Sequence, residues 1–134
     1  ASLEEVTFTS GIETIGEWMF YGCSSLATIV DFPESVKEIG AHAFENCAAL
    51  TAVTVPNTVI KIADSAFACD FYGKKIKKVI LPTTIKEIGR SAFFNCHSLE
   101  DINLYYLTSL TIIGDYAFAS NDIKSEMIKK VKIC

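Results

Sequence analysis

The sequence predicts an α/β repeat solenoid, in which similar coils stack with a parallel β-sheet on one face and short helical, 3₁₀ or irregular turns on the other. A small residue after isoleucine recurs at steps of 24, 23, 26 and 25 residues, and a phenylalanine follows it four positions later each time. The small residues are Gly16, Gly40, Ala63, Gly89 and Gly114, and the phenylalanines are Phe20, Phe44, Phe67, Phe93 and Phe118. Two markers that keep the same steps along the whole chain indicate internal repetition.

The composition indicates one folded domain without a basic surface. Of the 134 residues, 50% are hydrophobic and 21% are charged, which is a balance typical of globular proteins. The net charge of −4 argues against nucleic acid or an anionic membrane as a partner, because such binding needs a basic face. No apolar run approaches the ~18 residues of a membrane-spanning helix, so no membrane insertion is expected.

The first half of each repeat predicts a β-strand. Apolar residues stand at its start, three positions later and five positions later, as at Leu50, Val53 and Val55. The last two have period-2 spacing and share one face of a strand. Three of the strands end at a proline, which cannot donate to a ladder. The repeats are predicted at about residues 3–25, 26–49, 50–75, 76–98 and 99–127, with a partial sixth at 128–134.

The second half of each repeat predicts a tight turn. An apolar pair three residues apart, such as Ile85 and Ile88, precedes the glycine. The segment that follows, such as 90–93, is long enough for one helical or 3₁₀ turn only. The recurring glycine predicts either a positive φ or a close approach to the neighbouring coil. One unit cannot bury its apolar face alone, so stacking is required and the phenylalanine column is expected to contribute most.

The order of strand, proline, apolar pair, Ile-Gly, Ala-Phe and cysteine resembles the BspA-type leucine-rich repeat over nearly the whole chain. The resemblance implies a right-handed leucine-rich-repeat superhelix. It also implies a non-catalytic module, without a cofactor, of a cell-surface or secreted protein that binds host or matrix proteins in adhesion. The family has no universal site residues. An intracellular scaffold or effector module and a structural spacer are the alternatives.

Cysteine recurs at one repeat position, at Cys23, Cys47 and Cys96. We interpret these residues as small buried hydrophobes with a weak S–H donor. Disulfides are disfavoured because stacked neighbours point their Cβ atoms in parallel. Cys134 is expected to be exposed and able to form an intermolecular disulfide. No Cys-x-x-Cys pair predicts a metal site, and Cys96-His97 is a poor nucleophile–base pair because neighbours in sequence usually point apart.

The outward positions of the strands carry charges and a mildly apolar stripe. Lysines and acids alternate between successive repeats, as at Lys78 and Asp101, and this pattern favours a ladder that fixes the strand register. Ile80 belongs to the apolar stripe, which indicates either a partner surface or ordinary β-branched strand residues.

Insertions lengthen two joins between repeats and the fifth repeat. The insertions carry tyrosine and phenylalanine, which are good contact residues when they lie on loops. The binding candidates are Phe71, Tyr72, Tyr105, Tyr106 and, on the strand, Ile80. The alternative is that these rings fold back to fill gaps in an irregular repeat. The second repeat has one extra residue near Asp31, which leaves its register open.

The chain starts and stops at a predicted strand, without the polar caps that solenoids normally carry. The missing caps predict that the chain is a segment of a longer array and a monomer. The alternative is that an uncovered end pairs with a second copy to form an end-to-end homodimer.

Overall fold

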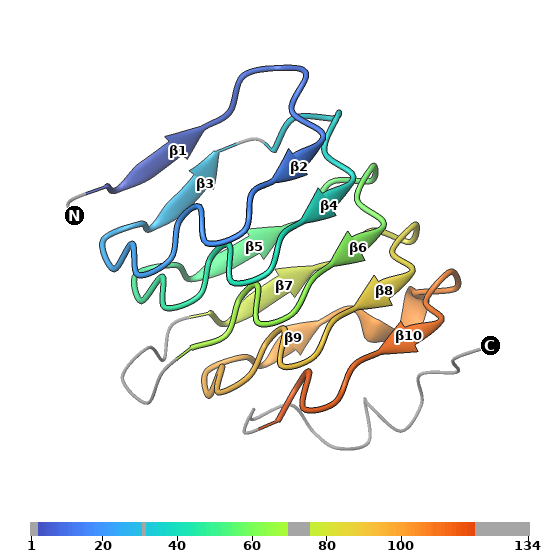
Figure 1. Ribbon diagram of the computed structural model, residues 1–134. Coiled ribbons are helices and arrows are strands. Elements are labelled where there is room, and N and C mark those ends of the chain that lie inside the picture. Colours follow the sequence, from blue (N-terminus) through green and yellow to red (C-terminus); the bar gives the residue numbers. More distant parts are fainter. Residues whose placement is uncertain (1–2, 31, 70–75, 120–134) are drawn as a thin grey trace.

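The protein is a solenoid of stacked coils, each of which contributes two short strands (Figure 1). The computed structural model describes residues 3–30, 32–69 and 76–119. Strands of successive coils are parallel and in register. The predicted repeat solenoid with a parallel sheet is therefore confirmed.

The first row of strands comes from the predicted strand segments. It consists of β1 (Glu5–Thr7), β3 (Thr28–Val30), β5 (Ala52–Thr54), β7 (Lys78–Ile80) and β9 (Asp101–Ile102). The middle residue of β5 and of β7, Val53 and Val79, is buried, and the flanking residues are exposed. This burial is what period-2 alternation predicts for a sheet with one face on the core.

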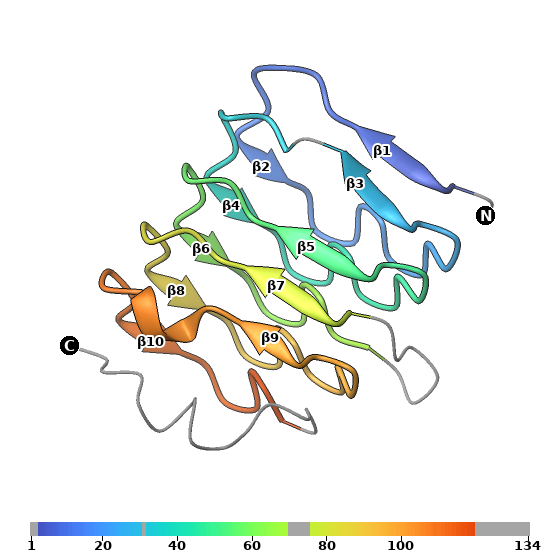
Figure 2. The same cartoon turned by 180° about the vertical axis from the view of Figure 1, so that it is seen from behind.

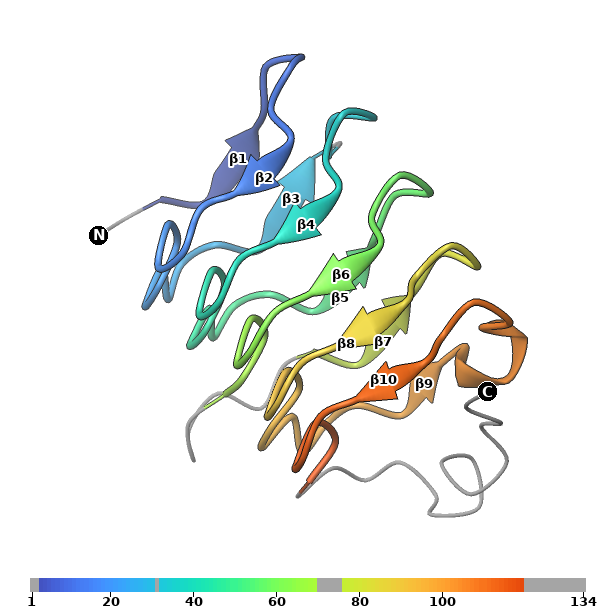
Figure 3. The ribbon, with the colours of Figure 1, turned by 45° about the vertical axis from the view of Figure 1, so that its right-hand side comes forward.

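A second row of strands lies on the opposite side of the coil (Figure 3). It is one five-stranded sheet of β2 (Thr14–Ile15), β4 (Glu38–Ile39), β6 (Lys61–Ile62), β8 (Glu87–Ile88) and β10 (Ile112–Ile113). The sequence analysis expected only turns here. Each strand is two residues long, which is too short to produce a recognisable alternation.

The turns after the glycine form a further hydrogen-bonded ladder between coils. The N–H groups of Trp18, Phe20 and Gly22 donate to the carbonyls of residues 41, 43 and 45 in the next coil, at 2.8–3.0 Å. Within a coil, the N–H of Ala43 donates to the Gly40 carbonyl in a 3₁₀-type bond of 3.2 Å. The predicted single turn is thus present, and its backbone is satisfied mainly by its neighbours.

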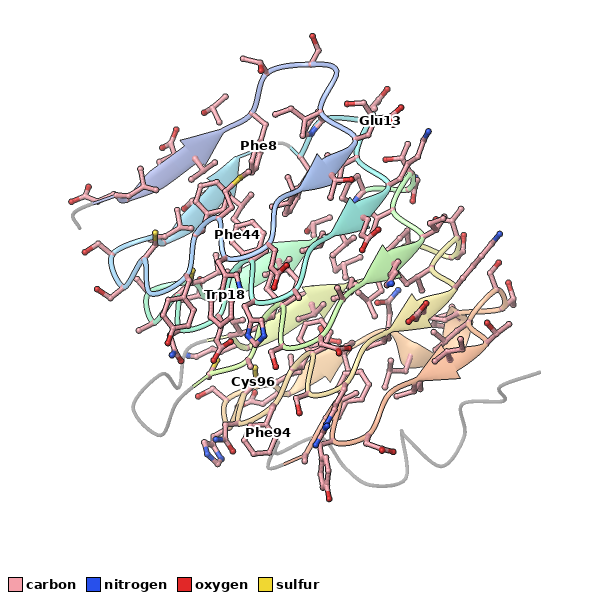
Figure 4. The ribbon with its side chains drawn as sticks, viewed as in Figure 1. Phe8, Glu13, Trp18, Phe44, Phe94 and Cys96 are labelled. Atoms are coloured by element: carbon pink, nitrogen blue, oxygen red, sulfur yellow. The ribbon has the colours of Figure 1, made fainter. Side chains whose placement is uncertain are left out.

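The core consists mainly of Ile, Leu, Val and Ala side chains and contains a column of stacked phenylalanine rings, against whose first ring Phe8 packs at 5.8 Å (Figure 4). The centroids of successive rings are 5.1–5.5 Å apart and their planes lie within 14° of parallel. The column consists of Phe20, Phe44, Phe67, Phe93 and Phe118. The predicted spine of five rings is confirmed.

The recurring glycine is explained by close approach between coils. A Cβ atom on Gly40 would lie 2.6 Å from the Ile15 carbonyl oxygen, and one on Gly114 would lie 2.4 Å from the Arg90 nitrogen. Neither glycine has a positive φ. Positive φ values of 54–61° occur two residues later, at Trp18, His42, Ser65, Ser91 and Tyr116.

The first row of strands is interrupted between the second and third repeats. β1 pairs with β3, while β5, β7 and β9 form a separate sheet. Figure 2 shows β3 and β5 further apart than the neighbouring strands of this row. The second row is continuous across the same boundary, through β4 and β6. The coils therefore stay attached on one side and are separated on the other.

Candidate functional site

The predicted binding residues are placed as follows. Ile80, on β7, is 40% exposed, and Tyr106, in the 3₁₀ helix η1 (Leu104–Tyr106) after β9, is 71% exposed. The side chain of Tyr105 and the whole of Phe71 and Tyr72 lie outside what the structure describes. The binding role of these five residues stays a prediction.

The insertion of the fifth repeat is filled by leucines. Leu104 and Leu107 are buried in the core, whereas the ring of Tyr106 stays in solvent. For Tyr106 the gap-filling alternative is therefore wrong, since the aliphatic neighbours occupy the gap.

Asn103 continues the ladder where β9 ends. Its carboxamide accepts a hydrogen bond from the Leu81 N–H at 2.7 Å and donates one to the Leu81 carbonyl at 2.8 Å. The Asn103 side chain thus makes the two hydrogen bonds to Leu81 that a peptide group would make if β9 continued past Ile102.

An open groove lies on the sheet face where the first row is interrupted. It has a volume of about 440 Å³, within the ~300–1,000 Å³ typical of ligand sites. The described residues that line it, all of them uncharged, are Ala27, Thr28, Ile29, Phe32, Thr51, Ala52, Thr54 and Pro56.

The sequence does not predict this groove, although an extra residue near Asp31 leaves the register of the second repeat open. Leu26 and Pro33 are seven residues apart, whereas Leu50 and Pro56 are six apart. This difference in length falls just after β3, the strand at which the first row is interrupted. Phe32 stacks on the ring of Phe8, with centroids 5.6 Å apart, and lines the groove.

Charged ladders run along both rows of strands. Lys78 and Asp101, which are paired in register, have a charge separation of 3.6 Å. On the second row, Lys61 lies between Glu38 and Glu87 at 3.9 and 4.0 Å. These side chains are 35–65% exposed to solvent, so each pair contributes about 0.2–1 kcal/mol. The predicted pairing of Lys78 with Asp101 is confirmed, and the second-row ladder is new.

An aromatic cluster that the sequence analysis missed lies on the turns after the glycine. The rings of Trp18 and His42 stack with centroids 3.9 Å apart, and Tyr21 meets Trp18 edge to face at 5.0 Å. Trp18 and Tyr21 are each about half exposed. The signal in the sequence was the shared repeat position of Trp18 and His42, two residues after the glycine.

Cys23, Cys47 and Cys96 are free thiols, as the sequence predicts. Cys47 and Cys96 donate to the carbonyls of Phe20 and Phe67 in the preceding coil, at 3.3 and 3.2 Å. Burial raises the pKa of the Cys47 thiol to about 12, and repulsion from Cys23 adds to the shift. A hydrogen bond with Cys69, whose sulfur lies 3.4 Å away, and burial raise the pKa of Cys96. Both thiols are therefore protonated at neutral pH and are poor nucleophiles.

These thiols predict an alkaline loss of stability. The folded chain holds the Cys47 proton to a pKa of about 12, while the unfolded thiol releases it near 9.0. The unfolded state then binds fewer protons, so the free energy of unfolding falls as pH rises from about 9 towards 12 and is unaffected below. Urea titrations between pH 8 and 10.5 should show a shallower fall for Cys47→Ala than for the unmodified chain. Equal slopes would contradict this assignment.

Within the described ranges, no three His, Cys, Asp or Glu side chains converge as a metal site would require. Among the residues that the structure describes, no helix has the length and apolarity needed to cross a bilayer.

Comparison with known proteins agrees with this architecture. The family model for the BspA type Leucine rich repeat region matches six copies, over residues 1–70 and 70–133. No curated protein matches the chain.

Three solved structures are similar in fold. A Treponema pallidum leucine-rich repeat protein is 26% identical, with a TM-score of 0.74, over 90% of this chain and 54% of its own. A leucine-rich repeat protein from Bacteroides ovatus is 30% identical, with a TM-score of 0.69, over 91% of this chain and 37% of its own. A leucine rich cell surface protein from Faecalibacterium prausnitzii is 26% identical, with a TM-score of 0.60, over 85% and 38%.

The chain thus spans about half or less of the length of each of these proteins. The match of the family model over nearly every residue, together with the stacked parallel strands, shows that this chain belongs to the BspA-type leucine-rich repeat family.

Proposed function

We propose that this chain is a protein-binding module of a bacterial surface or secreted protein and mediates adhesion to host or matrix proteins. The observation that carries the proposal is the outward face of the first row of strands. There the groove beside β5 continues into Thr54, which is paired in register with the exposed Ile80 of β7. We define the sheet-face surface as the exposed strand residues Thr28, Ala52, Thr54 and Ile80 together with Tyr106, which is exposed in η1 after β9.

The chemistry of this surface suits a protein partner. Ile80 and Tyr106 offer apolar and aromatic contact area to solvent, and tyrosine is enriched among residues that dominate binding energy. Leucine-rich repeat domains generally mediate protein interactions, and the similar Faecalibacterium protein is described as a cell surface protein. Both facts support a role in adhesion.

The test is a binding screen against immobilised matrix proteins such as collagen, laminin and fibronectin, measured by surface plasmon resonance. For a partner found in this way, the double variant Ile80→Ser/Tyr106→Ala should weaken binding at least about tenfold. The matched control is Ile112→Ser/Tyr116→Ala, which removes the same residue types from other exposed positions, 51% and 62% exposed. The control should leave the affinity unchanged. An empty screen, or equal losses for both double variants, would argue against the proposal.

A further inference from the structure

We propose that the groove between β3 and β5 binds an uncharged peptide segment in extended conformation, which adds a strand along the edge of β5. This inference rests on the proposed function and names its partner class, a linear segment of the bound protein. The contacts at the interrupted boundary carry it.

The first step concerns the backbone groups that face the groove. At other repeat boundaries an N–H at the start of the strand donates across the coils, as Lys77 does to the Thr51 carbonyl and Glu100 to the Lys77 carbonyl. Among the described residues, the equivalent N–H of Thr51 has no hydrogen bond across its boundary. Two strands with unpaired edges therefore face one another within the row, and such edges accept additional strands.

The second step gives the direction of these groups. The N–H of Val55 donates to the Ile80 carbonyl at 2.9 Å, and the Thr51 carbonyl accepts from the Lys77 N–H at 2.8 Å. These two backbone groups therefore point towards β7. In a parallel strand, the backbone N–H and C=O groups of successive residues point alternately towards the strands on its two sides. Ala52 and Thr54 thus present their N–H and C=O groups towards β3, two residues apart, which is the period at which an extended peptide offers complementary groups.

The third step concerns charge. Among the residues that the structure describes, the lining consists of alanine, threonine, isoleucine, phenylalanine and proline. An ionised side chain held among them would lose hydration without gaining a partner. The walls therefore favour small, β-branched and apolar side chains in the peptide and disfavour charged ones.

The fourth step is that the groove is held open. The second row pairs β4 with β6 across this boundary, so the two coils stay joined on that side. On the first row, β3 and β5 belong to separate sheets at the same boundary. A preformed groove lowers the conformational cost of binding.

The experiment uses a labelled, end-capped peptide Leu-Thr-Ala-Val-Thr-Val-Pro, a copy of residues 50–56, titrated with the full chain by fluorescence polarisation. We expect saturable binding that weakens at least about tenfold when alternate peptide nitrogens are methylated, because these hydrogen bonds are lost. A peptide with both threonines replaced by glutamate should weaken by a similar factor. Amide NMR shifts should change at Ala52 and Thr54.

Two variants of the chain locate the site. Deletion of Asp31 restores the spacing of residues 50–56, should rejoin the two sheets and should abolish peptide binding while the chain stays folded. Thr54→Arg, which fills the groove, should abolish it as well. Thr7→Arg, at the equivalent exposed position of β1, should leave it intact.

Three results would overturn the proposal: no binding at millimolar peptide, unchanged binding after deletion of Asp31, or equal effects of the two arginine variants. The matrix screen separates this failure from that of the proposed function. If a matrix protein binds the unmodified and the Asp31-deleted chains equally, only the groove proposal falls.

Discussion

Replacement of Phe67 by alanine is expected to lower the free energy of unfolding by about 3–5 kcal/mol. The ring is fully buried and stacks between Phe44 and Phe93, with both centroids 5.3 Å away. The substitution removes two ring contacts and leaves a cavity between coils that the ladders hold apart. In a solenoid each coil contacts only its neighbours, so this cavity weakens the joint between the two halves of the chain. Urea unfolding followed by circular dichroism measures the loss.

The matched control is Phe94→Ala, which removes the same kind of side chain directly after Phe93 in the sequence (Figure 4). Phe94 is only partly buried and is not a member of the ring column. Its loss should cost about 1 kcal/mol. If the two variants lost equal stability, the ring column would not be the main source of cohesion between coils.

Replacement of Gly89 by alanine is expected to cost about 1–3 kcal/mol, because the added methyl group has no space. Its Cβ would lie 2.7 Å from the carbonyl carbon of Ala63 and 2.7 Å from the nitrogen of Asp64, both backbone atoms of the preceding coil. It would also lie 2.6 Å from the Asp64 carboxylate that accepts from the Arg90 N–H. The coils would have to separate or slide to admit it.

Gly16→Ala is the control for this prediction. Gly16 is in the first coil described, and a Cβ there would meet only the flexible side chain of Met19, at 3.0 Å. It should change the free energy of unfolding by no more than about 0.5 kcal/mol. Ala63 stands at the same repeat position and shows that one coil accommodates a methyl group, which places the expected cost for Gly89 below that of a core deletion. Thermal melts that fail to separate the two variants would refute the close-approach explanation.

The candidate site was only partly predictable. Ile80 was identified from its outward strand position and is exposed on β7. The loop aromatics were chosen because insertions lie at the surface, and Tyr106 is indeed exposed there. The sequence does not predict the groove, because a single extra residue can be absorbed by a bulge or can break a ladder, and only the lack of pairing between β3 and β5 distinguishes these outcomes.

By itself, the sequence determined the repeat unit, the parallel stacking, the column of five rings and the free thiols. All of these follow from residues that recur at fixed steps, and equivalent positions must meet when coils stack. The tertiary structure alone decided the second sheet, the choice of close approach over positive φ at the recurring glycine, and the opening beside β5. Those features depend on how one coil's backbone lies against the next, which the recurrence of a residue type does not specify.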